Sequence, residues 1–172
     1  MYWSTTTGAK YVVGGILTRY RATGAQGTWG FPTTDEVDVA GGRASYFQKA
    51  HIYWTRSTGA REVHGAILKK FLSTGGPTVN GFPTTDETKT ADGVGRFNHF
   101  TASRSIYWTS GTGAHLIRGG IRSTWVRLGA ERSRLRYPSS DERATSYGAV
   151  SYFQGGRIEW RRATNTIGVY VS

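Results

Sequence analysis

The heptapeptide Gly30-Phe31-Pro32-Thr33-Thr34-Asp35-Glu36 occurs again without change at 81–87, and in altered form at 136–142 as Arg136-Tyr137-Pro138-Ser139-Ser140-Asp141-Glu142. Four tryptophans keep nearly the same period, at spacings of 51, 54 and 52 residues: Trp3, Trp54, Trp108 and Trp160. Two independent markers with one period indicate tandem repeats, which pack on their neighbours because one short repeat cannot bury a core alone. We therefore expect a single domain over 1–172, with repeats at about 1–51, 52–105 and 106–157 and a partial fourth at 158–172.

Each repeat contains the pattern of an amphipathic helix. Val63, Ile67 and Phe71 recur every four positions, which is typical of a helix with one buried face. Pairs of small residues open the helices, at 14–15, 65–66 and 119–120, and we expect another backbone to approach closely there. We expect the helices to end at the glycines that follow them, Gly24, Gly75 and Gly129.

A short antiparallel sheet follows each helix. Aromatic stretches such as 45–47 and 52–54 are separated by a short connection, which predicts a β-hairpin, and a third short strand is expected after it. The predicted fold class is α+β. It consists of three pseudo-symmetric units of about 51–55 residues, each one helix plus a small antiparallel β-hairpin or three-stranded meander.

Composition narrows the function classes. The 172 residues include no Cys, which excludes a disulfide framework, a thiolate metal site and a cysteine nucleophile. No apolar run approaches the ~18 residues that cross a bilayer, and the first ten residues lack the apolar core of a signal peptide. We expect no membrane span, and any export signal is absent from this chain. The net charge of +11, from 17 Arg and 5 Lys against 11 acids, makes an anionic polymer an alternative partner.

The helix with its leading small pair, the turn at 81–87 and the stretch from Ile106-Tyr107-Trp108 to Gly113-Ala114-His115 together resemble the LGFP repeat family, over practically the whole chain. The resemblance implies a repeat from secreted proteins of actinobacteria, such as the C-terminal module of mycolyltransferases. Such repeats are taken to hold their protein on the arabinogalactan-containing cell wall. The resemblance thus implies an extracellular, wall-bound module, a polysaccharide partner and a catalytic domain elsewhere in the parent protein.

The repeated aromatic residues are candidates for stacking on sugar rings. A flat apolar face with a polar edge suits sugar CH groups, and a place in the core between repeats is the alternative for Trp54 and Trp108. Strand alternation puts Tyr53 and Tyr107 on the opposite face, so one member of each pair is expected to be partly exposed. We interpret the tyrosines as the better ligand candidates.

Charged residues supply the remaining candidates. The repeated Asp-Glu pairs suggest turn structure rather than catalytic acids, because they recur beside a proline in every repeat. An alternative is that the second carboxylate, Glu36, Glu87 or Glu142, bonds sugar hydroxyls in one equivalent pocket per repeat. Arg118 and Arg136 are candidates for contacts with an anionic surface.

Catalysis has no candidate in this sequence. The four His do not show metal-ligand spacing, and there is no Ser-His-Asp arrangement or glycine-rich phosphate loop. We therefore expect no metal, no cofactor and no enzyme activity, and a cell-wall anchoring module as the function. A polyanion or nucleic-acid binding module is the first alternative, although no helix-turn-helix or RNA-binding motif supports it. A wall hydrolase is the second.

Overall fold

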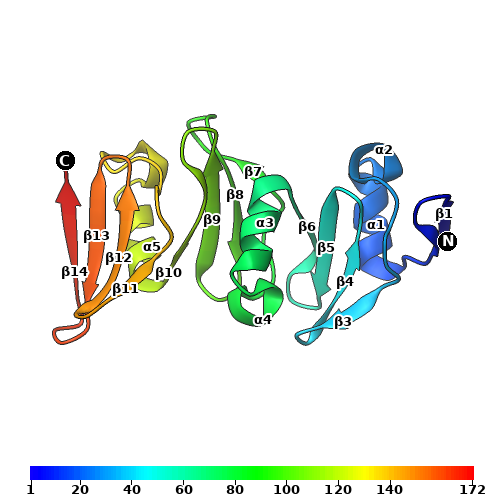
Figure 1. Ribbon diagram of the computed structural model, residues 1–172, viewed down its shortest axis with the longest axis horizontal. Coiled ribbons are helices and arrows are strands. Elements are labelled where there is room, and N and C mark those ends of the chain that lie inside the picture. The colour runs from blue at the N-terminus through cyan, green and yellow to red at the C-terminus, as the bar shows by residue number, and fades with distance from the viewer. The chain divides into compact units, whose positions relative to one another are not determined.

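The computed structural model describes all 172 residues and shows a mixed α and β fold, in which short helices alternate with four small antiparallel sheets (Figure 1). The chain divides into two compact units: unit 1 is Met1–Glu87 and unit 2 is Thr88–Ser172. The pseudo-symmetry of three repeats and their boundaries stay predictions.

Unit 1 holds two sheets and four helices. A two-stranded sheet comes first, made of β1 (Tyr2–Ser4) and β2 (Gly8–Lys10), followed by α1 (Gly14–Ala22) and α2 (Ala25–Trp29). A four-stranded sheet follows with its strands in sequence order: β3 (Val37–Val39), β4 (Gly42–Tyr46), β5 (Ala50–Thr55) and β6 (Gly59–His64). Two further helices, α3 (Gly65–Ser73) and α4 (Gly76–Asn80), complete the unit.

Unit 2 has a helical segment between two four-stranded sheets. The first sheet comprises β7 (Thr88–Lys89), β8 (Arg96–Phe100), β9 (Arg104–Thr109) and β10 (Gly113–Arg118). The helical segment comprises α5 (Gly119–Arg127) and a short 3₁₀ turn, η1 (Ala130–Arg132). The second sheet comprises β11 (Arg143–Thr145), β12 (Gly148–Phe153), β13 (Gly156–Arg161) and β14 (Thr166–Val171).

The predicted hairpin or three-stranded meander is wrong by one strand, because each full sheet has four. The additional strands β3, β7 and β11 are only two or three residues long and pair with the strand that follows them. The protein is therefore richer in β structure than predicted. Its helical parts are also more numerous, since the short α2, α4 and η1 follow the three predicted helices.

In unit 1, helices contact both faces of the four-stranded sheet. Tyr20 of α1 is fully buried, stacks on Phe47 with 4.3 Å between ring centroids, and donates a hydrogen bond from its hydroxyl to the Gly30 carbonyl at 2.8 Å. On the other face, Phe71 of α3 packs edge-on against Tyr53 with the centroids 5.4 Å apart. Neither face of this sheet is therefore left entirely to solvent.

In unit 2, α5 contacts strands of both sheets. Trp125 of α5 is fully buried between Tyr107 of β9, at 4.8 Å between centroids, and Phe153 of β12, at 5.7 Å. Its indole N–H donates a hydrogen bond to the Arg136 carbonyl at 2.9 Å. Trp125 thus occupies the place that Tyr20 holds in unit 1 and bonds the corresponding turn carbonyl.

The small pairs at the helix starts serve a different purpose from the predicted one. The first residue of each pair, Gly14, Gly65 or Gly119, has φ of 51°, 56° or 53°, a left-handed conformation that favours glycine. An added Cβ at any of these three would meet nothing within 4 Å, so close backbone approach is not the reason. The predicted helix-ending glycines are confirmed, with φ of 99°, 102° and 107° at Gly24, Gly75 and Gly129.

Candidate functional site

The aspartate of each repeated turn has a structural role. In all three turns its carboxylate accepts a hydrogen bond from a backbone N–H that lies 24 or 25 residues earlier. The pairs are Tyr11 with Asp35 at 2.8 Å, Glu62 with Asp86 at 3.1 Å, and Leu116 with Asp141 at 2.9 Å. The interpretation of the Asp-Glu pairs as turn structure is therefore confirmed for the aspartates, each of which binds its turn to a residue in or directly after the strand that precedes the helices.

The glutamate of each turn faces a basic side chain. The contacts are Glu36 with Arg43 at 2.6 Å, Glu87 with His64 at 3.4 Å, and Glu142 with Arg118 at 2.9 Å. The glutamate side chains are only 9–13% exposed. Glu142 and Arg118 are separate candidates in the sequence, and the structure brings them together. Each such pair offers both acceptors and donors to a hydroxylated ligand.

A small pocket lies at the start of α1 in unit 1. It encloses about 160 Å³ and is lined by Gly14, Gly15, Ile16, Glu36, Arg43 and Trp54, and we call it the α1 pocket. The indole of Trp54 lies so close to Gly15 that a Cβ added there would sit 2.8 Å from Cδ1 of the ring. The second glycine of the pair therefore accommodates a side chain rather than a backbone.

A larger pocket lies at the corresponding place in unit 2. It encloses about 460 Å³ at the start of α5, and we call it the α5 pocket. Its lining repeats the α1 pocket through Gly119, Gly120, Ile121, Glu142, Ala149 and Trp160, and adds Ala102, Arg104, Arg118, Asn165 and Ile167. The same set of parts, a helix start, a turn glutamate and a strand tryptophan, is thus found in both compact units.

The residues beside each tryptophan in the sheet differ between the two pockets. Trp54 pairs with Arg43 on one side and Ala60 on the other, whereas Trp160 pairs with Ala149 and Ile167. In unit 2, Ile167 takes the contact with the helix start, 3.2 Å from the position of a Cβ on Gly120. The methyl group of Ala149 is too short to reach Glu142 as the Arg43 guanidinium reaches Glu36. The α5 pocket is therefore larger than the α1 pocket.

The expectation that the tyrosines are the better ligand candidates is wrong in its premise. Tyr53 is 1% exposed and Tyr107 is 5% exposed, because each packs against a helix that follows its sheet, through Phe71 or Trp125. Burial raises the pKa of both hydroxyls well above the usual range. Trp54 and Trp108 are half-buried, so the accessible member of each pair is the tryptophan.

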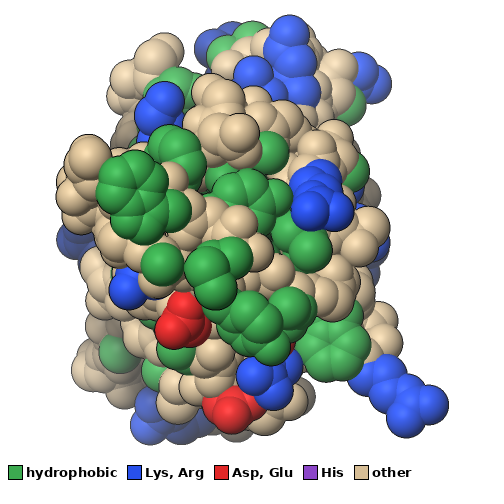
Figure 2. All heavy atoms as spheres, turned by 90° about the vertical axis from the view of Figure 1, so that its right-hand side faces the viewer, with side chains coloured by type: hydrophobic (Ala, Val, Ile, Leu, Met, Phe, Trp, Pro, Cys, Tyr) green, Lys and Arg blue, Asp and Glu red, His purple; other side chains and the backbone are tan.

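Trp3, the first of the repeated tryptophans, is 64% exposed and lines neither pocket. Figure 2 shows the face of the molecule on the right-hand side of Figure 1, where hydrophobic side chains gather with Lys and Arg side chains around them. Met1 and Tyr11 are the other large hydrophobic residues exposed near the amino-terminal strands. Trp3 therefore differs from Trp54 and Trp160, which have a glutamate and a helix start beside them.

Arg136 does not join the other candidates. It lies in a separate pocket of about 400 Å³ in unit 2, whose lining includes Asp92, Glu131, Tyr137 and Gln154. Its φ of 56° is left-handed, like the 74° of Gly30 and Gly81 at the same place in the other turns. Arg136 thus keeps the positive φ of the other two turns although it is not a glycine.

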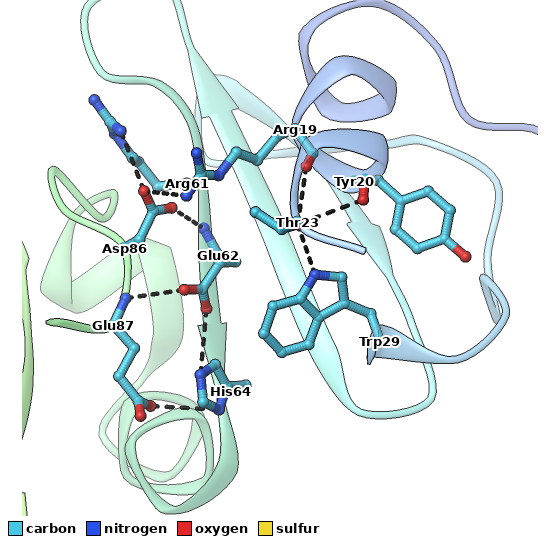
Figure 3. A network of polar contacts seen from close by, with 9 residues as sticks. All are labelled: Arg19, Tyr20, Thr23, Trp29, Arg61, Glu62, His64, Asp86 and Glu87. Carbon is cyan, nitrogen blue, oxygen red and sulfur yellow. Dashed lines mark hydrogen bonds and ion pairs between the residues drawn. The ribbon is translucent and has the colours of Figure 1, made fainter. Parts of the chain in front are cut away.

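A partly buried polar cluster in unit 1, drawn in Figure 3, has no signal in the sequence. Asp86 contacts the guanidinium groups of Arg19, at 2.5 Å, and Arg61, at 3.3 Å. The neighbouring carboxylate of Glu62 accepts the backbone N–H of Glu87 at 3.0 Å. The hydrophobic alternation of β6 gave no sign of a buried acid at position 62.

Glu62 is only 5% exposed, and burial raises the pKa of its carboxyl group to about 7. The negative charges of Asp86 and Glu87 raise this pKa further, while the hydrogen bond from the Glu87 backbone and the charge of Arg19 lower it. His64 lies 3.7 Å from the second Glu62 oxygen. Because a ligand cannot reach a group so buried, Glu62 acts on stability rather than on binding.

Neither a metal-binding group nor a membrane-spanning helix is present among the described residues. No group of three or more His, Cys, Asp or Glu side chains is arranged to hold a metal ion. None of the helices combines the length and apolar character that crossing a bilayer requires.

The chain is similar to one known family. The LGFP repeat family matches residues 30–78 and 81–133, which together make up more than half of the chain and give two tandem copies. LGFP repeats form a family of repeat modules and are not a known catalytic domain. A comparison with curated proteins finds no match. The repeated turns, helix starts and strand tryptophans agree with this match, and the chain belongs to the LGFP repeat family.

Proposed function

We propose that the chain is a non-catalytic module that anchors a secreted actinobacterial protein to a cell-wall polysaccharide of the arabinogalactan type, outside the cell. The family supports a repeat module, and the resemblance supports the wall as its location. In this proposal the parent protein carries its catalytic domain elsewhere in its chain.

One observation carries the proposal: the pocket that recurs in both compact units. Each pocket places a tryptophan next to a glutamate whose carboxylate is held by an arginine. An indole covers the apolar face of a sugar ring, while the ion pair exchanges hydrogen bonds with its hydroxyls.

Weak sites of this kind gain strength by acting together. Two pockets on one chain bind one polymer with an affinity well above that of either alone, because the second contact is intramolecular. The affinity for the polymer then depends on the number of pockets. The loss of one pocket weakens retention on a polymer more than it weakens binding of a single sugar.

Cosedimentation tests the proposal. The chain is incubated with purified arabinogalactan, peptidoglycan and DNA at low and high salt. We expect retention on wall polysaccharide that persists at high salt, since sugar stacking is screened far less than charge. Steep loss with salt, together with equal retention on DNA, would instead favour the polyanion module that the net charge of +11 suggests. The release of soluble sugar during the incubation would identify a hydrolase.

Substitutions connect retention to the pockets. Trp54→Ala and Trp160→Ala each remove one pocket wall, and we expect each to reduce polymer affinity about tenfold and the double variant to lose retention. Trp3→Ala is the matched control, because its indole is exposed and lines neither pocket. Equal effects of all three single substitutions, with folding intact by circular dichroism, would refute the pocket assignment.

A further inference from the structure

The two pockets differ in size in a way that matters for binding. The α5 pocket, at about 460 Å³, lies within the range of known small-molecule sites, whereas the α1 pocket, at about 160 Å³, lies below it. Ala102 and Arg104 line the α5 pocket alone, and a further difference lies at one position on the strand before the tryptophan. Arg43 fills this position in unit 1, where its guanidinium contacts Glu36, and Ala149 leaves it open in unit 2.

They also differ in charge. The α1 pocket holds one carboxylate, Glu36, and one guanidinium, Arg43. The α5 pocket holds one carboxylate, Glu142, and two guanidinium groups, Arg104 and Arg118. The lining of the α1 pocket is thus balanced, and that of the α5 pocket carries one positive charge in excess.

The two arginines of the α5 pocket are near enough to influence each other. Burial and the positive charge of Arg118 both lower the pKa of Arg104, and the carboxylate of Glu142 opposes them. Both guanidinium groups stay charged, because an arginine does not lose its proton in proteins. Two like charges that share a partly covered pocket attract a negatively charged ligand group.

The rest of the α5 pocket suits a ring. Ile121 and Ile167 supply apolar surface, and Trp160 is held in place by a hydrogen bond from its indole N–H to the Asn165 side chain at 3.0 Å. Guanidinium groups bind both carboxylate and phosphate with paired hydrogen bonds. The pocket therefore combines surface for a sugar ring with donors for an acidic group attached to it.

We infer that the α5 pocket binds a sugar unit carrying one acidic group, a carboxylate or a phosphate, and that the α1 pocket does not. This inference rests on the proposed function and specifies the ligand class of one of its two sites. The module then binds the acidic unit of its polymer in unit 2 alone.

Three sugars that share one ring test the inference on the full chain: methyl β-glucoside, methyl β-glucuronide and methyl β-glucoside 6-phosphate. Binding is followed by NMR through the indole N–H signals, assigned with Trp54→Phe and Trp160→Phe. We expect at least one acidic sugar to shift the Trp160 signal with a Kd at least tenfold below that of the neutral sugar, and to leave the Trp54 signal in place. Whether the glucuronide or the 6-phosphate binds more tightly shows whether the pocket prefers a carboxylate or a phosphate.

Two variants and one control distinguish a specific binding site from general attraction of an acidic sugar to a basic protein. Ala149→Arg adds a positive charge but fills the α5 pocket as Arg43 fills the α1 pocket, so we expect at least fivefold weaker binding of the acidic sugar. Arg118→Gln should weaken it similarly. Arg127→Gln removes the same charge from the exposed end of α5, outside the pocket, and should change Kd less than twofold.

The outcomes separate this inference from the proposed function. Equal affinity for neutral and acidic sugars at Trp160, or tighter binding by the Ala149→Arg variant, would overturn the inference while retention on the polysaccharide stands. If the chain is not retained on wall polysaccharide in the sedimentation assay but still binds acidic sugars at Trp160, the wall-anchoring function is overturned. The inference of a site for an acidic sugar then stands.

Discussion

The α1 and α5 pockets share a tryptophan, a turn glutamate and a helix start, yet the first encloses about 160 Å³ and the second about 460 Å³. Arg43 and Ala60 flank the indole in unit 1, and Ala149 and Ile167 flank it in unit 2. The shared parts are set by the fold, through glycine conformations and turn hydrogen bonds. Volume and charge are set by the neighbouring strands, so pockets can diverge while the fold stays the same.

The same contrast holds beneath the surface. Glu62 of β6 corresponds to Leu116 of β10, and both donate their backbone N–H to a turn aspartate. Leu116 buries an apolar side chain there, whereas Glu62 buries a carboxyl group with a pKa of about 7. Unit 1 therefore has a pH dependence at this position that unit 2 lacks.

The largest effect is expected from Glu62→Gln. The pKa of Glu62 is about 7 in the folded chain and 4.5 in the reference state, so its contribution is favourable below pH 4.5 and is lost as pH rises through 7. At pH 8 the substitution should raise the free energy of unfolding by about 1–3 kcal/mol, with little change at pH 4. Urea unfolding at both pH values measures this.

Asp38→Asn is the control for that experiment, because the Asp38 side chain is 85% exposed and its contact with Arg43 is a surface ion pair. The control should leave the pH dependence as it is. A Glu62→Gln variant with the same loss of stability between pH 4 and pH 8 as the parent would show that another group causes it.

Replacing the second glycine of each helix start by alanine, at Gly15 or Gly120, is expected to change the stability by different amounts in the two units. At Gly15 the new Cβ would lie 2.8 Å from the Trp54 ring, which should cost about 1–2 kcal/mol even after the better helix propensity of alanine. At Gly120 the nearest atom is the flexible end of Ile167 at 3.2 Å, so Gly120→Ala should change stability by less than about 0.5 kcal/mol. Thermal unfolding compares the two. A similar loss of stability at both positions would contradict the difference between the two helix starts, in which Trp54 contacts Gly15 and Ile167 contacts Gly120.

The smallest effect is expected from Arg136→Gly, which makes the third turn resemble the first two. A left-handed φ of 56° costs a non-glycine residue roughly 1 kcal/mol, partly offset by the greater freedom of glycine in the unfolded chain. We expect a gain in the free energy of unfolding of less than about 1 kcal/mol, measured by urea unfolding. Arg134→Gly, at a residue without positive φ, should instead destabilise slightly. A loss of stability in Arg136→Gly would show that the arginine side chain stabilises its turn.

The repeat pattern predicted the main elements of the fold. The helices around Ile67 and Ile121 and the hairpins ending at Trp54 and Trp160 lie where the periodicity places them. The strands β3, β7 and β11 were missed because two or three residues are too few for alternation to show.

The candidate site was only partly predictable. Alternation correctly separated Tyr53 from Trp54, but it could not tell which is buried, because helices contact both faces of that sheet. The pairing of Arg118 with Glu142 spans 24 residues, and no local pattern indicates it. The buried acid at Glu62 was missed for the same reason, since its neighbours come from the next turn.

The aspartate bonds have a consequence for how the chain folds. Each of them closes a segment of only 24 or 25 residues that contains one longer helix, a short helix or 3₁₀ turn, and the repeated turn. The entropy lost in closing such a segment depends on its own length and not on that of the whole protein. An array of these segments can form step by step from local encounters, so adding repeats need not slow the search for the native state.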